Sequence, residues 1–477
     1  MLTRRELLYR APVAAVAIRH AAASSISPAM SALSVYMSEA AARALPAEAA
    51  EKAKQHILDT VAAMVSGSEL PPGQFAIRYA RAHPSEKVAA VAASDVVCGA
   101  IEAAFANAML AHSDETDDSH APSQSHPGCS VVPAALAAGE QFGIDGARFV
   151  RAVALGYDIG TRFTMAIGIP GFQSGNHLST HAIAGTFGSA AAAASAAGFN
   201  ARQMRWVLDY ASQQASGIKA WQRDTDHIEK AFVFAGMPAR NGMTAVEIVA
   251  SGGTGVDDVL SGQDNFFLAY APQADPGKLI EKLGERFEVV RTNIKKWSVG
   301  SPIQAPLDAL ENLRKKRPFD AGQVQSVIVR VASSEAALVN NREMPDICLQ
   351  YMVAVMLLDQ TASFRSSHDK ARMQEPPVQR QRAKVQLISD PELERRLPRR
   401  EATVEITFSD GTKLAEHVDA VRGTAENPMS REEVIAKSRD LMAPVLGKPN
   451  TESLIDKLLS LEQLKSVREL RPLLQRA

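Results

Sequence analysis

Residues 182–198 read AIAGTFGSAAAAASAAG, a long stretch without a charged side chain. Alanine favours the helix strongly, and small side chains let neighbouring helices approach closely. The same small residues bury too little apolar surface to hold a segment in a lipid bilayer. The stretch therefore predicts a helix packed tightly among other helices, with no membrane as a partner.

Helical patterns extend on both sides of this stretch, from about residue 33 to about residue 290. Pro46 and Glu48 suit the first turn of one helix, because proline fits position N1 and a carboxylate suits the N-terminal dipole. Gly67 suits the end of that helix. Further helices are expected at 133–141, 146–157 and 201–212, with Gly143 and Gly198 at the boundaries.

The pattern changes after about residue 295. Residues 327–331 alternate as a strand does, 384–388 form a second β-like run, and 403–408 and 412–418 flank an Asp-Gly turn typical of a hairpin. A buried helix is expected at 347–358 and a loop at 366–382, where two prolines adjoin. From Ser430 to the end the pattern is helical again.

These patterns together predict a mainly α fold with two domains. A large all-helical domain comprises residues 31–294 and 426–477, and a smaller α+β lid domain is inserted at 295–425. Residues 1–30 are set apart as a leader, because Thr3-Arg4-Arg5-Glu6-Leu7-Leu8 looks like a twin-arginine export signal. Arg19 and His20 interrupt its apolar stretch, so the residues leave open a periplasmic location, if the leader is functional, and a cytoplasmic one.

The overall charge excludes one class of partner. Lys plus Arg number 52 and Asp plus Glu number 53, for a net charge of −1. A general nucleic-acid binder carries a basic surplus, so no nucleic-acid partner is expected. Three widely spaced cysteines, Cys98, Cys129 and Cys348, make no disulfide framework and no zinc pair, and we expect them to be buried apolar residues.

The densest chemistry is the acidic cluster His112-Ser113-Asp114-Glu115-Thr116-Asp117-Asp118-Ser119-His120, followed by His126-Pro127. Carboxylates placed so close together repel one another and raise one another's pKa. The cluster lies between two apolar helical stretches, at 103–110 and 131–138. It therefore predicts a functional loop that faces a cleft.

Two mechanisms could use this cluster. A carboxylate and a histidine could act as base and acid in proton transfer. Alternatively, Asp114-Glu115-Thr116-Asp117-Asp118 could bind magnesium and a diphosphate, as in helical isoprenoid synthases. That second mechanism needs another metal motif downstream, for which 256–260 is a poor substitute. We therefore predict no metal site.

Five motifs in order resemble the MmgE/PrpD family. They are the acidic cluster with His126-Pro127, then Gly185-Thr186-Phe187-Gly188-Ser189-Ala190-Ala191-Ala192, Gly236-Met237-Pro238-Ala239-Arg240-Asn241-Gly242, Lys295-Lys296-Trp297 and Leu349-Gln350-Tyr351-Met352. The resemblance covers about residues 33 to 470. It implies a large helical domain with an α+β lid, a homodimer, and chemistry without a metal or organic cofactor. The family includes 2-methylcitrate dehydratase, cis-aconitate decarboxylase and iminodisuccinate epimerase.

The resemblance also implies roles for particular residues. It matches His126 to the family histidine, Lys230 to its active-site lysine and Tyr351 to its lid tyrosine. Its aspartate falls on Glu115 with Asp114 adjacent, and its threonine falls on Ser119, which keeps the hydroxyl. A further family histidine falls on Ser179, which His177 and His181 flank. At this position the sequence departs from the family pattern.

The residue types suit proton transfer beside a carboxylate. We expect His126 to be the acid or base, Asp117 and Asp118 to orient it or act themselves, and Tyr351 to donate from the lid or else lie in the core. Lys230 and either Lys295 or Lys296 are expected to bind substrate carboxylates, with Arg240 as a helper or in a structural ion pair. The remaining histidines are interpreted as structural or exposed without partners, at positions 56, 368 and 417. Trp221 and Trp297 either wall the pocket or pack in the core.

The resemblance and the isolated cations favour a cofactor-independent lyase of the dehydratase or hydratase type, acting on a small di- or tricarboxylate. An epimerase or isomerase, a decarboxylase on a similar polycarboxylate, and a non-catalytic carboxylate-binding protein remain as alternatives.

Overall fold

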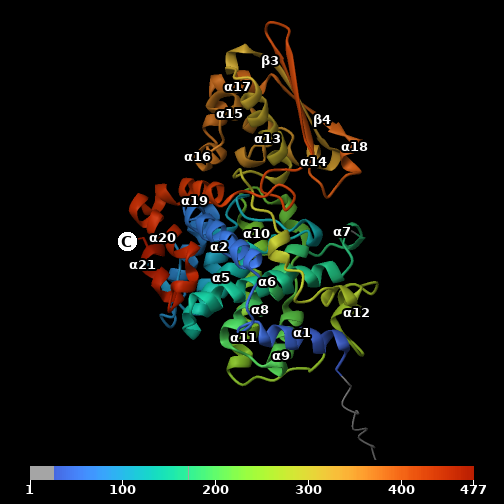
Figure 1. The fold of residues 1–477 in the computed structure, drawn as a ribbon, viewed down its shortest axis with the longest axis vertical. Helices are drawn as coiled ribbons and strands as arrows, with labels where there is room; N and C mark the ends of the chain where they lie inside the picture. The colour runs from blue at the N-terminus through green and yellow to red at the C-terminus, as the bar shows by residue number, and fades with distance from the viewer. Residues whose placement is uncertain (1–25, 170, 477) are drawn as a thin grey trace, which may run out of the picture.

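The computed structural model of the chain describes residues 26–169 and 171–476 (Figure 1). The export motif predicted at residues 3–8 lies outside this range. The first part of the described chain is helical, apart from the short antiparallel pair β1 (Ala89–Ala90) and β2 (Val97–Cys98). Its α-helices are α1 (Pro28–Glu39), α2 (Ala47–Gly67), α3 (Pro71–Ala82), α4 (Ala100–Ala111), α5 (Gly128–Phe142), α6 (Gly146–Ala166), α7 (Gly171–Gly175), α8 (Thr180–Ala197), α9 (Ala201–Gln214), α10 (Ile228–Ala231), α11 (Met237–Ala250) and α12 (Phe266–Tyr270).

The small-residue stretch forms α8, which packs against α6, α5 and α11 at the centre of this part. A methyl group on Gly188 would lie 2.8 Å from the carbonyl oxygen of Gly156, and one on Gly160 would lie 2.3 Å from that of Ala184. Such contacts are too short for real side chains, so the approach of α6 to α8 requires glycine. The predicted close packing of this helix is confirmed.

Several predicted helices match closely, and one predicted loop is wrong. The helix predicted from Pro46 to Gly67 is α2, and α5 begins five residues before the predicted Pro133, which lies inside the helix. The expected loop at 366–382 instead contains α17 (Pro376–Arg382). Its two prolines occupy the first turn, where proline lacks only an N–H that would have no helical partner.

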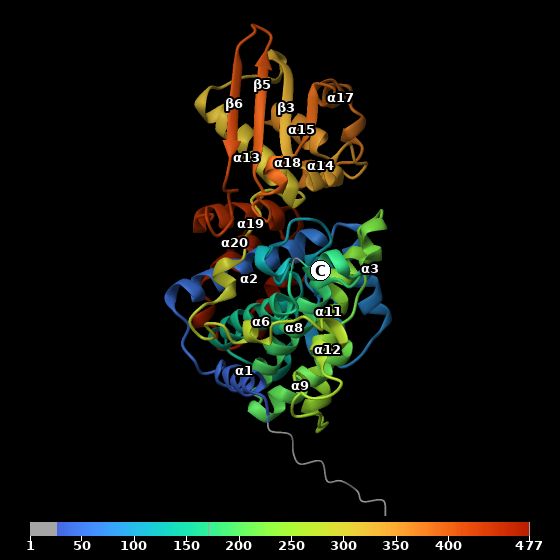
Figure 2. The same cartoon turned by 90° about the vertical axis from the view of Figure 1, so that its right-hand side faces the viewer.

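A four-stranded sheet with its own helices forms the second part of the chain (Figure 2). The elements, in order, are α13 (Ser301–Lys316), β3 (Val324–Ala332), α14 (Ser333–Val339), α15 (Leu349–Asp359), α16 (Phe364–His368), α17, β4 (Val385–Asp390), α18 (Pro391–Glu394), β5 (Ala402–Phe408) and β6 (Lys413–Val418). The strand order is β4-β3-β5-β6, with β3 and β4 parallel and the other pairs antiparallel.

One face of this sheet is covered by helices. Alternate residues of β5 are buried, as expected for a sheet with one packed face. Helix α13 packs on β5 and β6, and α15 packs beside β4. The predicted hairpin is β5–β6, and Gly411 in its turn has a φ of 82°, which glycine adopts without steric cost.

The described chain contains two large hydrophobic cores. One lies among the helices of the first part, and the other includes residues from Trp297 to Val421. The last helices, α19 (Arg431–Leu446), α20 (Lys448–Leu459) and α21 (Arg471–Leu474), contribute to the first core. Figure 1 shows α19 and α20 beside α2. The mainly α fold is thus confirmed, while the boundaries of the domains stay predictions.

Membrane-spanning helices are not found in the described part of the chain. None of its helices combines the length and the apolar character that a bilayer crossing requires. This agrees with the small-residue interpretation of α8.

Candidate functional site

The acidic cluster lies in the loop between α4 and α5, beside a cleft of about 740 Å³. Both parts of the chain line this cleft. The first part contributes Glu115, Ser119, His126, His181, Trp221, His227, Lys230, Phe234 and Lys295, among others. The second part contributes residues between 300 and 347 and between 398 and 426.

Asp117 is the centre of the site. Its carboxylate lies 2.8 Å from Nδ1 of His112, 3.2 Å from Nδ1 of His126 and 3.6 Å from Nζ of Lys295. The Asp117 side chain is completely buried, whereas that of His126 is 13% exposed toward the cleft. If His126 donates its Nδ1 proton to Asp117, its Nε2 becomes the acceptor available in the cleft.

Burial and neighbouring charges together determine the protonation states of Asp117, His126 and Lys295. Burial alone would raise the pKa of Asp117, but His112, His126 and Lys295 hold it well below its usual value. Burial lowers the pKa of His126, with Asp117 opposing the shift, so the imidazole is neutral at neutral pH. For Lys295, burial is outweighed by Asp117 and Glu115, which raise its pKa and keep it charged.

The structure separates the two candidates for the family aspartate. Glu115 faces the cleft, where its carboxylate contacts the ammonium groups of Lys230 and Lys295. Asp114 instead lies 3.0 Å from Nε2 of His368, on helix α16 of the second part. Glu115 therefore stands beside both lysines, and Asp114 joins the two parts of the chain.

Three histidine rings lie against the ring of Phe234, and a fourth lies next to one of them. His181 stacks on it at 3.7 Å between centroids and His112 at 4.7 Å, and the ring of His126 lies 5.1 Å from that of His181. The ring of His227 lies 5.2 Å from that of His112. Among the described residues, Nε2 of His112, Nδ1 of His181 and Nε2 of His227 have no hydrogen-bond partner. Buried nitrogens of this kind can bond to a polar ligand or to water.

Asp118 belongs to a buried layer beneath the cleft. It accepts hydrogen bonds from the hydroxyl of Tyr157 at 2.6 Å and the backbone N–H of Gly128 at 3.0 Å, and lies 3.1 Å from Nδ1 of His56. Gly128 begins α5, so Asp118 holds the start of that helix. This carboxylate fixes the loop from below.

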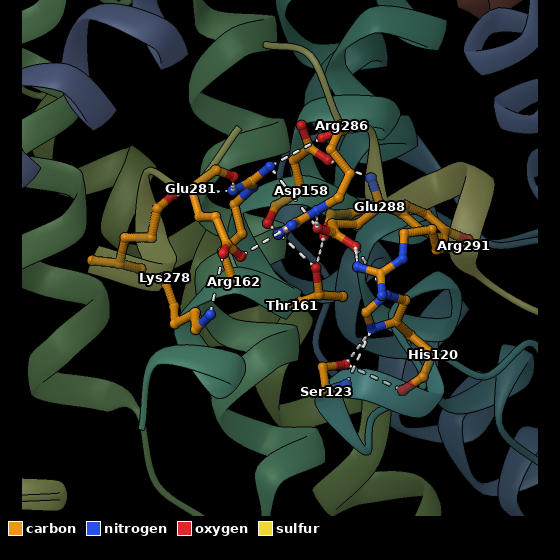
Figure 3. A network of polar contacts seen from close by, with 12 residues as sticks. His120, Ser123, Asp158, Thr161, Arg162, Lys278, Glu281, Arg286, Glu288 and Arg291 are labelled. Carbon is orange, nitrogen blue, oxygen red and sulfur yellow. Dashed lines mark hydrogen bonds and ion pairs between the residues drawn. The ribbon is translucent and has the colours of Figure 1, made fainter. Parts of the chain in front are cut away.

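A second polar network supports the other end of the loop (Figure 3). Glu288 lies 3.2 Å from Nε2 of His120 and accepts hydrogen bonds from Arg286 at 2.7 Å and Arg291 at 2.9 Å. Its backbone N–H donates to Asp158 on α6 at 2.6 Å. His120 and Arg291 also line the cleft. The network therefore fixes the loop that carries His126 to the helical core.

Comparison with known proteins places the chain in a family. The model of the MmgE/PrpD N-terminal domain matches residues 31–278, and that of the MmgE/PrpD C-terminal domain matches residues 297–462. The chain belongs to the MmgE/PrpD family. The family resemblance expected from the five motifs is thereby confirmed.

Curated relatives in this family are similar over most of their length. Cis-aconitate decarboxylase of Aspergillus terreus (strain NIH 2624 / FGSC A1156) is 25% identical over 460 residues, covering 90% of this chain and 92% of that protein. The enzyme of the same name from Mus musculus is 25% identical over 394 residues, covering 78% of each chain. That from Homo sapiens is 24% identical over 452 residues, covering 89% and 90%.

Not every predicted residue of this MmgE/PrpD protein lies at the cleft. Lys296 contacts Glu311 at 2.7 Å, and Arg240 bonds to Asn241. Tyr351 is buried in the second core, where its hydroxyl donates to the carbonyl of Ser366 at 2.7 Å. Ser179 is buried before α8, with no hydrogen-bond partner for its hydroxyl among the described residues. Of the two lysine alternatives, Lys295 lies in the cleft.

The structure also decides what was expected of the two tryptophans and of three histidines. Trp221 lines the cleft, while Trp297 packs in the second core and donates to Asp308 at 2.9 Å. The expectation that three histidines lack partners is wrong. His56 and His368 face Asp118 and Asp114, and His417 lies 3.1 Å from Glu401. Their partners are distant in sequence or, for His417, on the neighbouring segment, so residue order alone gave no signal.

One group could in principle hold a metal ion. Donor atoms of His112, Asp117 and His126 all lie within 4.8 Å of one another. However, the charged ammonium of Lys295 lies 3.6 Å from Asp117 and would repel a cation bound there. The donors are also already engaged with one another by hydrogen bonds. The arrangement suits proton transfer better, and metal-free chemistry stays a prediction.

The Asp114–His368 contact predicts a pH-dependent stability. Burial would lower the pKa of His368, but Asp114 and Asp346 raise it to about 9. The contact of protonated His368 with these carboxylates stabilises the fold fully below about pH 6.5. This contribution to the free energy of unfolding is lost as the pH rises through 9. We expect His368→Asn to lower the free energy of unfolding by up to about 3 kcal/mol at pH 6.5 and by much less at pH 9.5.

Chemical denaturation at the two pH values measures this difference. His417→Asn is the matched control, because His417 also faces a carboxylate but is 41% exposed. Asp346 faces His368, and burial raises its pKa to about 7, so the double variant His368→Asn/Asp346→Asn separates the two titrations. A stability loss that is equal at both pH values would contradict the assignment.

Proposed function

We propose that this protein is a cofactor-independent lyase acting on a small tricarboxylate of the cis-aconitate kind. The observation that carries the proposal is the position of neutral His126, held by buried Asp117, in a cleft that also contains Lys230 and Lys295. The central step is proton transfer to or from a carbon next to a carboxylate. The relatives named as cis-aconitate decarboxylases support a tricarboxylate as substrate.

The two lysines have the role of binding carboxylates in this proposal. Both contact Glu115, so a substrate carboxylate can share or replace that contact. Lys295 also donates to the backbone carbonyl of Glu115 at 2.9 Å, which holds its ammonium in place. Such preorganised cations stabilise the negative charge that develops as the neighbouring carbon gains or loses its proton. Residues 295–425 serve as the lid.

Decarboxylation is the reaction that we place first, because relatives from three organisms carry that name. The bond from carbon to the departing carboxylate breaks, and its electron pair forms a new carbon–carbon double bond. The electron pair of the original double bond takes a proton at the carbon next to another carboxylate. His126 delivers that proton from Nε2 after taking it up from solvent, and Asp117 balances the charge of the protonated ring. Carbon dioxide leaves, so neither an oxidant nor a reductant is needed.

Dehydration of a hydroxy-tricarboxylate is the second candidate. The lowered pKa of His126 leaves its imidazole neutral and able to remove a proton, as an elimination requires. Because the same groups would serve an epimerase, product analysis must decide among these reactions.

A substrate panel tests the proposal. The protein is incubated separately with cis-aconitate, citrate and 2-methylcitrate, and products are followed by proton NMR and by release of carbon dioxide. Release of carbon dioxide supports the decarboxylase, and formation of an alkene from a hydroxy acid supports the dehydratase. Inversion of a stereocentre without either would assign an epimerase. Binding without any conversion would leave a carboxylate-binding protein and overturn the proposed lyase.

A further inference from the structure

The wall that the second part of the chain gives to the cleft has an exposed apolar surface. Leu338, at the end of α14, lines the cleft and is 60% exposed, which is the largest exposure among the big hydrophobic side chains of the described residues. Met344, Ile347 and Pro398 line the same cleft. Carboxylates gain nothing from contact with such side chains, because burying a charge against apolar surface costs free energy.

The cleft is also large for a small tricarboxylate. Its volume of about 740 Å³ lies within the range of pockets that enclose drug-sized ligands, which is about 300–1,000 Å³. The groups around Lys230 and Lys295 suffice for carboxylates, so much of the space beside Leu338 is left for another part of a ligand.

Two arginines on this wall can contact an anionic ligand, and the exposed carboxylates of Asp419 and Glu426 line the same cleft. Arg342 and Arg399 line the cleft and are exposed, and neither has an ion pair among the residues that the structure describes. In contrast, the neighbouring cleft residues Arg400 and Arg422 are held by Glu335 and Glu433. Free cations beside an apolar surface are complementary to an anionic, amphipathic molecule.

We infer that the cleft accepts a tricarboxylate that carries an alkyl chain, with the chain lying on Leu338, Met344 and Ile347. This inference rests on the proposed function, because it places the carboxylate end of the ligand at Lys230 and Lys295. It adds a specificity-determining wall to the site. Arg342 and Arg399 attract the anionic end during entry.

Binding measurements with unreactive probes test this inference. The probes are propane-1,2,3-tricarboxylate and the same molecule with a butyl or a hexyl chain, measured by calorimetry. Complete burial of a methylene group tightens binding by about fourfold. On a half-open wall we expect about twofold for each methylene, so the hexyl probe should bind several tens of times more tightly than the unsubstituted one.

The Leu338→Asn variant makes the wall polar without adding charge and should remove most of that gain, so that the hexyl and unsubstituted probes bind it with similar affinity. Leu268→Asn is the matched control, because Leu268 on α12 is 56% exposed and does not line the cleft. It should change the affinity of neither probe. Analytical ultracentrifugation of both variants reports whether the substitution alters association of the chain.

Three outcomes would overturn the inference. In the first, the hexyl probe binds no more tightly than the unsubstituted one. The proposed function then stands, but the wall does not bind an alkyl chain. In the second, Leu338→Asn alters association of the chain without affecting binding of the hexyl probe, which assigns the wall to contact with a second copy. In the third, none of the probes binds the wild-type protein, and the proposed function fails together with the inference.

Discussion

Replacing Asp117 with asparagine should lower kcat on the protein's tricarboxylate substrate by about a thousandfold or more. The buried carboxylate orients His126 through Nδ1 and balances the charge of Lys295. An asparagine side chain can present its N–H₂ group to the imidazole, which favours the wrong tautomer and leaves Lys295 less well paired. General acid–base groups contribute about 10²–10⁴ in rate, and loss of their orientation removes much of that.

Steady-state kinetics over a range of pH measures this effect. Asp95→Asn is the matched control, because Asp95 pairs with Arg81 at the surface and is 67% exposed. Its kcat should stay within twofold of wild type. Circular dichroism shows whether the Asp117 variant is folded. A folded Asp117→Asn protein with normal kcat and an unchanged pH profile would remove Asp117 from the mechanism.

Replacing Lys437 with methionine should destabilise the fold by about 3–5 kcal/mol, because a buried ion pair that loses one partner leaves an uncompensated charge. Lys437 on α19 lies 2.6 Å from the fully buried Asp59 on α2 and donates to the carbonyl of Thr116 at 2.9 Å. Burial raises the pKa of Asp59, and Lys437 opposes that shift. Without the lysine, Asp59 must stay charged without a partner or take up a proton.

Denaturant unfolding measures this loss of stability. Arg439→Met is a control on the same helix, since Arg439 pairs with Glu452 at the surface with both side chains 47% exposed. We expect it to cost less than about 1 kcal/mol. The double variant Lys437→Met/Asp59→Asn should recover part of the loss, because it removes the stranded charge. Equal effects of Lys437→Met and Arg439→Met would show that the buried pair contributes little.

Local sequence signals predicted most of the fold. The small residues in 182–198 predicted the tightly packed α8, and the Asp-Gly turn predicted the β5–β6 hairpin. The failure at α17 arose from reading Pro376 and Pro377 as a break, whereas prolines also suit a first helical turn. A pair of prolines can end a helix or begin one, and the local sequence does not show which of the two the tertiary structure favours.

The candidate site was predictable where its chemistry is concentrated in one loop. His126 and Asp117 lie in the same motif, and their contact follows from it. The choice between Asp114 and Glu115 did not follow, because it depends on His368, which is far away in sequence. Glu288, which fixes His120 from a different segment, gave no signal for the same reason.

Motif membership also did not say which side chains face the cleft. Tyr351, Lys296 and Arg240 all lie in motifs of the family. The side chain of Tyr351, however, bonds within the second core. Lys296 bonds to Glu311, and Arg240 bonds to Asn241. One residue of shift along a helix or loop turns a side chain away from a pocket. Lys295 and Lys296 are adjacent, and only Lys295 reaches the acidic loop.

Deuterium uptake tests the central claim most directly. The wild-type protein and the Asp117→Asn variant are incubated with cis-aconitate in D₂O, and the carbons next to each carboxylate are followed by NMR. The proposed proton transfer by His126 predicts that wild type introduces deuterium at one such carbon, at a rate that falls by about a thousandfold or more in the variant. Failure of the wild type to introduce deuterium, or equal rates for the two proteins, would contradict it.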